Sequence, residues 1–92
     1  KILLFLKIIR MERNEISTIV KEVIAQNSRH SVSEVTFSSP LDKYISSFMK
    51  DRLASKLKNR FTKVQLTDLK NQLYDSIKKV SQLIDYIEKV YK

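Results

Sequence analysis

Apolar residues recur at helical spacing in three stretches of the chain. In the first, intervals of three and four predict an amphipathic helix. Its apolar positions are Ile16, Ile19, Val20, Val23 and Ile24. The second stretch predicts another helix with one apolar side, formed by Phe48, Met49, Leu53, Leu57 and Phe61.

The third stretch is long, and it divides into two helices. Its apolar positions are Leu66, Leu69, Leu73, Ile77, Val80, Leu83, Ile84, Ile87 and Val90. Asp75 and Ser76 are residue types that favour helix N-caps, and they stand directly before a fresh apolar series. We therefore expect a short helix over residues 66–72 and a final helix over 76–91, rather than the single long helix of a coiled-coil hairpin.

A long connection separates the first two predicted helices. Residues 26–31, QNSRHS, are polar and read as the end of the first helix and a loop. Residues 32–40, VSEVTFSSP, are rich in strand-forming residues but have no partner strand in the pattern, which favours an extended connection. The chain's one proline, Pro40, closes this loop. The pattern as a whole predicts an all-α fold, a small four-helix bundle with a long first loop.

The N-terminal segment KILLFLKIIRM is apolar but short. A membrane span needs about twenty apolar residues, so we expect no membrane span here. We expect instead an apolar helical extension over residues 1–12, either separate from the first helix or continuous with it, followed by one helical domain over residues 13–92. An exposed apolar run between Ile2 and Ile9 would be a surface for self-association.

The composition limits the chemistry that the chain can perform. It has no cysteine and no glycine, and His30 is the sole histidine, so a thiolate metal site and a glycine-rich phosphate loop are excluded and a metal ligand set is not expected. The aspartates are spread over different segments, and no nucleophile–base pair is evident. We therefore predict a protein that is not an enzyme. The lack of cysteine fits a reducing, cytoplasmic location.

The net charge of +8, from 18 basic and 10 acidic residues, favours an anionic partner such as nucleic acid or an acidic protein face. Five basic residues fall on the second predicted helix and are candidates for a partner-binding face: Lys50, Arg52, Lys56, Lys58 and Arg60. A solvated helix face explains them equally well.

Two adjacent serines, Ser46 and Ser47, stand at the start of this basic helix. One interpretation is that either serine is an N-cap, the commonest use of serine at a helix start. The other is that one of them carries a covalent group. A phosphate ester there would meet unpaired backbone N–H groups and the positive end of the helix dipole.

The order of several motifs resembles the acyl and peptidyl carrier protein family. SEVT (33–36), PLDKY (40–44) and LTDLKNQLYDSIKKVSQLIDYIEK (66–89) are similar to the family's first loop, to the segment ahead of its modified serine and to its last two helices. Phe48, Leu53, Leu57 and Phe61 follow Ser47 at the offsets of the family's buried positions. The similarity covers about residues 14–90.

The chain departs from the family pattern around the serine. The family's G-x-D-S becomes Tyr44-Ile45-Ser46-Ser47, so the glycine is missing and Ser46 replaces the aspartate. Asp51 stands where the family usually buries an apolar residue. The acidic face of the family's second helix is basic here.

The resemblance implies that Ser47, with Ser46 as second choice, carries 4′-phosphopantetheine. The arm would hold an acyl or polyketide intermediate as a thioester, as in fatty acid or polyketide biosynthesis. The implied partners are a phosphopantetheinyl transferase and acyl-processing enzymes whose docking faces are acidic. Two alternatives remain open: a carrier-like fold without the arm that serves as a docking or regulatory module, and a small basic helical protein that binds nucleic acid.

Overall fold

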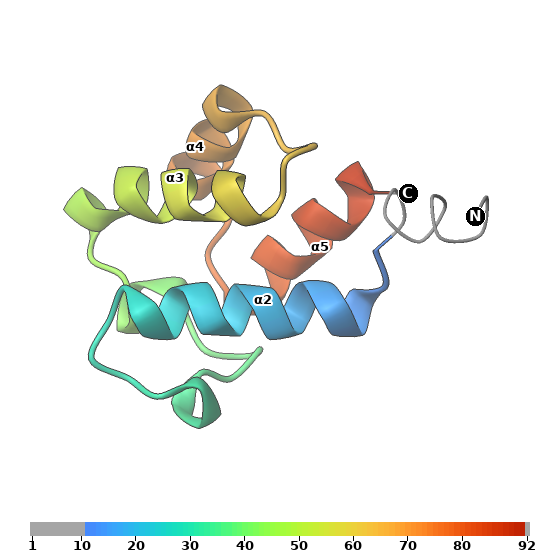
Figure 1. The fold of residues 1–92 in the computed structure, drawn as a ribbon. Coiled ribbons are helices and arrows are strands. Elements are labelled where there is room, and N and C mark those ends of the chain that lie inside the picture. Colours follow the sequence, from blue (N-terminus) through green and yellow to red (C-terminus); the bar gives the residue numbers. More distant parts are fainter. Residues whose placement is uncertain (1–10, 92) are drawn as a thin grey trace.

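Four α-helices build the part of the chain that the computed structural model describes, residues 11–91 (Figure 1). They are α2 (Arg13–Gln26), α3 (Lys50–Arg60), α4 (Leu66–Asp75) and α5 (Val80–Val90). The long connection from α2 to α3 contains three short 3-10 turns, at Val32–Glu34, Leu41–Lys43 and Ser47–Met49. The predicted all-α bundle with a long first loop is confirmed.

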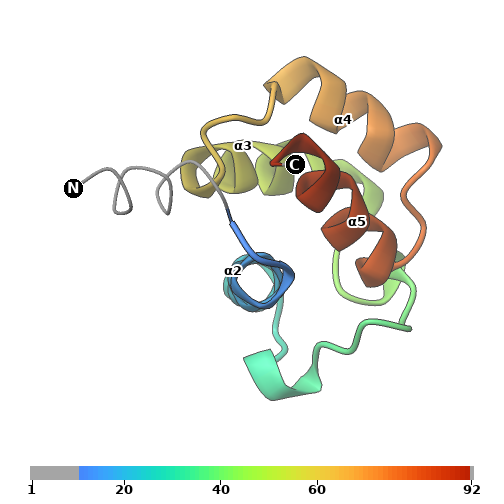
Figure 2. The ribbon, with the colours of Figure 1, turned by 90° about the vertical axis from the view of Figure 1, so that its right-hand side faces the viewer.

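The four helices are arranged around a common interior (Figure 2), and their buried apolar side chains form a single core there. Helix α2 packs against α3 and α5, and α3 packs against α4. The helical residues at the centre of this core are Ile16, Val20, Val23, Ile24, Leu53, Leu57, Leu69, Leu73, Val80, Leu83, Ile84 and Ile87. They are the positions that the helical periodicity of the sequence selects.

The helices are short, and α2, with 14 residues, is the longest. Within residues 11–91, none of them has the length and apolar content required to cross a membrane.

Helix α2 begins at Arg13 because the backbone of Glu12 is extended. The Glu12 N–H donates to Glu15 Oε1 over 3.3 Å, which closes the first turn. The helical backbone of α2 therefore does not extend through Glu12 toward the N-terminal segment. Residues 1–10, including the apolar run from Ile2 to Ile9 that was considered for self-association, lie outside the described residues.

The boundary between α4 and α5 lies later than the sequence pattern predicted. The N–H groups of Ser76 and Ile77 both donate to the Gln72 carbonyl, at 2.9 and 2.7 Å, and this ends α4 after Asp75. The prediction that Asp75 and Ser76 are N-caps of the last helix is therefore wrong, and α5 begins at Val80 instead of residue 76. Tertiary pairing of the linker, described next, outweighs the local N-cap preference.

The long first loop is fastened to the linker between α4 and α5. Pro40 and Lys79 form an antiparallel bridge. The Leu41 N–H donates to the Lys78 carbonyl over 2.8 Å, and the Ser81 N–H donates to the Phe37 carbonyl over 2.9 Å. The extended connection predicted for residues 32–40 is only partly present, because Val32–Glu34 form a 3-10 turn and the Ser39 N–H closes a further turn on the Thr36 carbonyl over 3.3 Å; its last residue, Pro40, does find a pairing partner in the chain.

Chain reversals occur without left-handed backbone, since no residue among 11–91 has a positive φ. Polar side chains close several helix ends in place of glycine. Gln82 Oε1 accepts the N–H groups of Lys78 and Lys79, at 2.7 and 3.0 Å, at the start of α5. Lys58 Nζ donates to the carbonyls of Thr62 and Val64, at 2.7 and 2.6 Å, beyond the end of α3.

Two phenylalanines at opposite ends of α3 provide a matched test of the core. Phe61 is 0% exposed, whereas Phe48 is 83% exposed. We predict that Phe61→Ala lowers the free energy of unfolding by about 3–5 kcal/mol, through lost burial and a cavity. Phe48→Ala should change it by less than about 0.5 kcal/mol. Urea denaturation followed by circular dichroism measures both. Equal losses in the two variants would contradict the packing described here.

Candidate functional site

The candidate site is the turn that leads into α3, here called the Ser47 turn (residues 46–49). Ser46 has an extended backbone, and its carbonyl accepts the Met49 N–H over 2.9 Å. The Lys50 N–H donates to the Ser47 carbonyl, so the 3-10 turn continues directly into α3. Both serine side chains are exposed. Ser47 therefore presents its hydroxyl to solvent at a helix start.

Three hydrogen-bonding groups at the start of the Ser47 turn have no partner within the described residues. Ser46 occupies the N-cap position, but its side chain makes no capping hydrogen bond. Within the described part of the chain, the N–H groups of Ser47 and Phe48 also donate to no acceptor. A helix start with free N–H groups attracts an anion. The geometry at this point suits a negatively charged group on the Ser47 hydroxyl.

The prediction that Phe48 lies on the buried side of this helix is wrong. Phe48 belongs to the 3-10 turn, not to α3, and its ring projects into solvent. Stepping back from the buried Leu53 by three and four residues leads to Lys50 and Met49. Met49 packs against the core, and Lys50 takes the other inward position.

Lys50 is a structural residue instead of a free partner-binding group. The residue as a whole is only 8% exposed. Its Nζ lies 3.6 Å from Asp42 Oδ1 and 5.5 Å from the centroid of the Tyr74 ring. The aliphatic stem of Lys50 is buried, and its ammonium group lies close to a carboxylate and an aromatic ring, both of which favour a positive charge. Lys50 thereby links the Leu41–Lys43 turn, α3 and α4.

The other basic residues of the predicted face divide into two groups. Lys58 is bound to backbone carbonyls, as described above, and Arg60 lies 3.4 Å from Glu22 of α2. Arg52 and Lys56 are exposed and form no ion pair within residues 11–91. Phe48, Arg52 and Lys56 are spaced four residues apart, and we call this exposed set the α3 stripe.

Tyr74, in the last turn of α4, reaches across to the Ser47 turn. Its Oη donates to Asp51 Oδ1 over 3.1 Å and lies 3.4 Å from the Ser47 carbonyl oxygen. The hydrogen bond with Asp51, and secondarily burial, raises the pKa of Tyr74. Asp51 is exposed and engaged by this hydroxyl, which explains how a carboxylate is accommodated at a position where the resemblance suggested an apolar residue. The contact was not expected, because Tyr74 lies on a different helix, 27 residues beyond Ser47 in the sequence.

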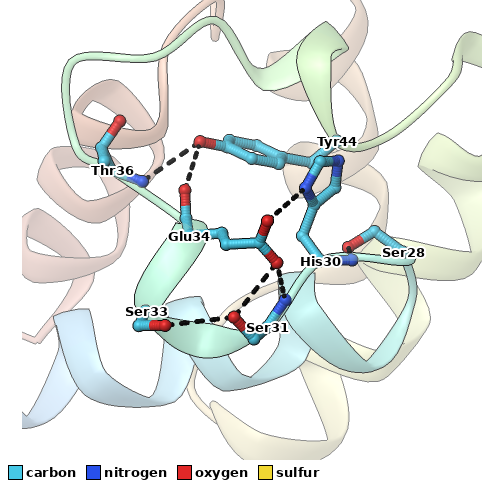
Figure 3. Close-up of polar contacts among 7 residues, drawn as sticks. All are labelled: Ser28, His30, Ser31, Ser33, Glu34, Thr36 and Tyr44. Atoms are coloured by element: carbon cyan, nitrogen blue, oxygen red, sulfur yellow. Dashed lines mark hydrogen bonds and ion pairs between the residues drawn. The ribbon is translucent and has the colours of Figure 1, made fainter.

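The loop ahead of the Ser47 turn is held by a polar network around Glu34 and Tyr44 (Figure 3). Glu34 Oε1 accepts the Ser31 N–H over 2.7 Å and the Ser31 hydroxyl over 3.1 Å. The buried Tyr44 donates from its hydroxyl to the Glu34 carbonyl over 3.0 Å and accepts the Thr36 N–H over 3.2 Å. These contacts fix the path of the chain from α2 to Pro40.

His30 contributes packing to this network. Its ring meets the Tyr44 ring edge-on, with centroids 5.0 Å apart, and its Nδ1 lies 3.8 Å from Glu34 Oε2 (Figure 3). His30 thus packs against the ring of Tyr44.

Comparisons of the chain with protein-family models, with curated proteins and with solved structures find no match.

The Glu34 network predicts a specific dependence of stability on pH. Hydrogen bonds from the Ser31 backbone and hydroxyl, and then the nearby His30, lower the pKa of Glu34 from its ordinary value of 4.5. A carboxyl group with a depressed folded-state pKa stabilises the fold above its unfolded pKa, and this contribution is lost as the pH falls through the folded value. We expect Glu34→Gln to be less stable than the wild type at neutral pH, and the gap to narrow below about pH 4.5.

Urea denaturation across this pH range measures the gap. Asp75→Asn is the matched control, since it removes one negative charge from the end of α4, away from the Glu34 network. A gap for Glu34→Gln that stays constant with pH would contradict the role assigned to the carboxylate.

Proposed function

We propose that the chain is a carrier domain of the acyl-carrier type, which holds 4′-phosphopantetheine on Ser47. The observation that carries the proposal is the exposed Ser47 at the start of the 3-10 turn that leads into α3, where the N–H groups of Ser47 and Phe48 have no acceptor within the described residues. The order of elements supports it as well: a long first helix, a long loop, a helix headed by the serine, a short helix and a closing helix.

The residues around Ser47 fit a phosphodiester. The free N–H groups of Ser47 and Phe48 and the dipole of α3 favour negative charge there. Two carboxylates lie nearby in the sequence, and both are engaged: Asp42 by the Lys50 ammonium and Asp51 by the Tyr74 hydroxyl. Their repulsion of a phosphate is therefore reduced.

In the proposed modification, Ser47 Oγ forms the new bond to phosphorus of coenzyme A. The pyrophosphate bond breaks, adenosine 3′,5′-bisphosphate leaves, and the hydroxyl proton passes to a base of the transferase. The arm, once attached, supplies a thiol that carries an acyl group as a thioester. The carrier's own residues present the serine and catalyse no step.

The α3 stripe supplies the proposed docking surface for the transferase and the acyl-processing enzymes. An exposed phenylalanine ring beside Ser47 suits an apolar pocket, and Arg52 and Lys56 suit acidic groups around it. Lys50, Lys58 and Arg60, which were also candidates, are engaged within the chain. This leaves α3 with few free cations, which disfavours α3 itself as a face for a nucleic-acid backbone.

A second candidate function is a docking module that carries no arm. The observation that favours it is the α3 stripe itself, because its three side chains are exposed independently of any group on Ser47. Ser46, in the place of the family's aspartate, is consistent with such a module. In this case binding of an acidic partner would survive replacement of Ser47.

Incubation of the protein with coenzyme A and a broad-specificity phosphopantetheinyl transferase tests the first candidate. We expect intact-mass spectrometry to show the gain of one arm in the wild type and in Ser46→Ala, and no gain in Ser47→Ala. Absence of any gain in the folded wild type, or a gain that persists in Ser47→Ala, would overturn the assignment.

A further inference from the structure

We propose that Tyr74 is a positioning residue for Ser47, which holds the Ser47 turn from the end of α4 in the conformation that presents the serine. The inference rests on the proposed function and extends it to a residue that lies 27 positions away in the sequence. It assigns to α4 a direct part in presenting the serine on α3.

The contacts of Tyr74 lie on both sides of the junction between the Ser47 turn and α3. Its hydroxyl proton faces two acceptors, Asp51 Oδ1 at 3.1 Å and the Ser47 carbonyl at 3.4 Å. The nearer acceptor is charged and takes the stronger bond. Since Ser47 begins the 3-10 turn and Asp51 lies in the first turn of α3, one side chain bridges the residues between them.

The ring of Tyr74 is fixed from the other side by Lys50. The Lys50 ammonium lies 5.5 Å from the ring centroid and 3.6 Å from Asp42. A cation near an aromatic face attracts it, and more strongly where water is excluded. The Lys50 ammonium therefore favours the orientation of the ring in which the hydroxyl meets Asp51.

The Ser47 turn has few restraints of its own, which is why this contact matters. It is a short 3-10 turn without a side-chain cap, and Phe48 gives it no anchor in the core. Met49 is its partly buried apolar contact. Short 3-10 turns have poorer hydrogen-bond geometry than α-helices, so a tie to a neighbouring helix restricts the turn substantially.

Tyr74→Phe tests the inference, because it removes the hydroxyl and keeps the ring beside Lys50. We expect amide hydrogen exchange in the folded protein to accelerate by about two- to tenfold at Met49 and Lys50, whose N–H groups are hydrogen-bonded within the turn, as for the loss of one net hydrogen bond. We expect kcat/KM for arm transfer to fall by a similar factor. Amides that exchange only through global unfolding should accelerate by no more than this factor, as they would for the loss of any hydrogen bond of similar strength.

Tyr86→Phe is the matched control. Tyr86 also donates its hydroxyl to a carboxylate, that of Asp68, but the pair joins α5 to α4 away from the turn. Its removal should leave exchange at Met49 and Lys50 unchanged. Asp51→Ala combined with Tyr74→Phe should be no worse than either alone, because both remove the same bond.

Exchange at Met49 and Lys50 that is unchanged in Tyr74→Phe, exchange there that rises equally in Tyr86→Phe, or a transfer rate equal to that of the wild type would each overturn the positioning role. If the wild type accepts no arm while exchange at Met49 and Lys50 accelerates in Tyr74→Phe and not in Tyr86→Phe, the carrier function fails and the hold of Tyr74 on the turn stands. The two failures are thus distinguishable.

Discussion

The pairing of the first loop with the α4–α5 linker is the constraint on which the candidate site depends. The Pro40–Lys79 bridge and the flanking backbone hydrogen bonds fix where the long loop returns to the bundle. The Leu41–Lys43 turn follows at once, and its Asp42 meets Lys50 at the start of α3. The position of Ser47 on the surface is therefore set by a contact that joins residues about forty positions apart, as well as by the preference of α3 for helix.

The helices and the core were predictable because they obey a local rule. Residues such as Ile16, Leu57 and Leu83 recur at helical intervals, and burial follows from that recurrence. The boundary at Asp75 was not predictable, because Ser76 has the local character of an N-cap but the chain beyond it pairs with Pro40. Where a tertiary hydrogen bond competes with a weak local preference, the sequence pattern alone gives the wrong residue.

The exposure of Ser47 agrees with its place in the sequence, but the fate of its neighbours does not follow from residue type. Phe48 is apolar and exposed, and Lys50 is charged and buried. This reversal of the expected exposure arises because the 3-10 turn shifts the register ahead of α3. Lys50 then takes the inward position between Asp42 and Tyr74. Charge counted along a helix therefore overstates the charge available to a partner.

The absence of left-handed backbone bears on how this domain tolerates substitution. Many folds depend on a few glycines, at which any replacement strains a turn; this chain contains none. Its helix ends depend instead on polar side chains such as Lys58 and Gln82, which reach back to the backbone from near the surface. Substitutions at such exposed polar positions should therefore destabilise the domain, although residue type alone would suggest that these positions tolerate replacement.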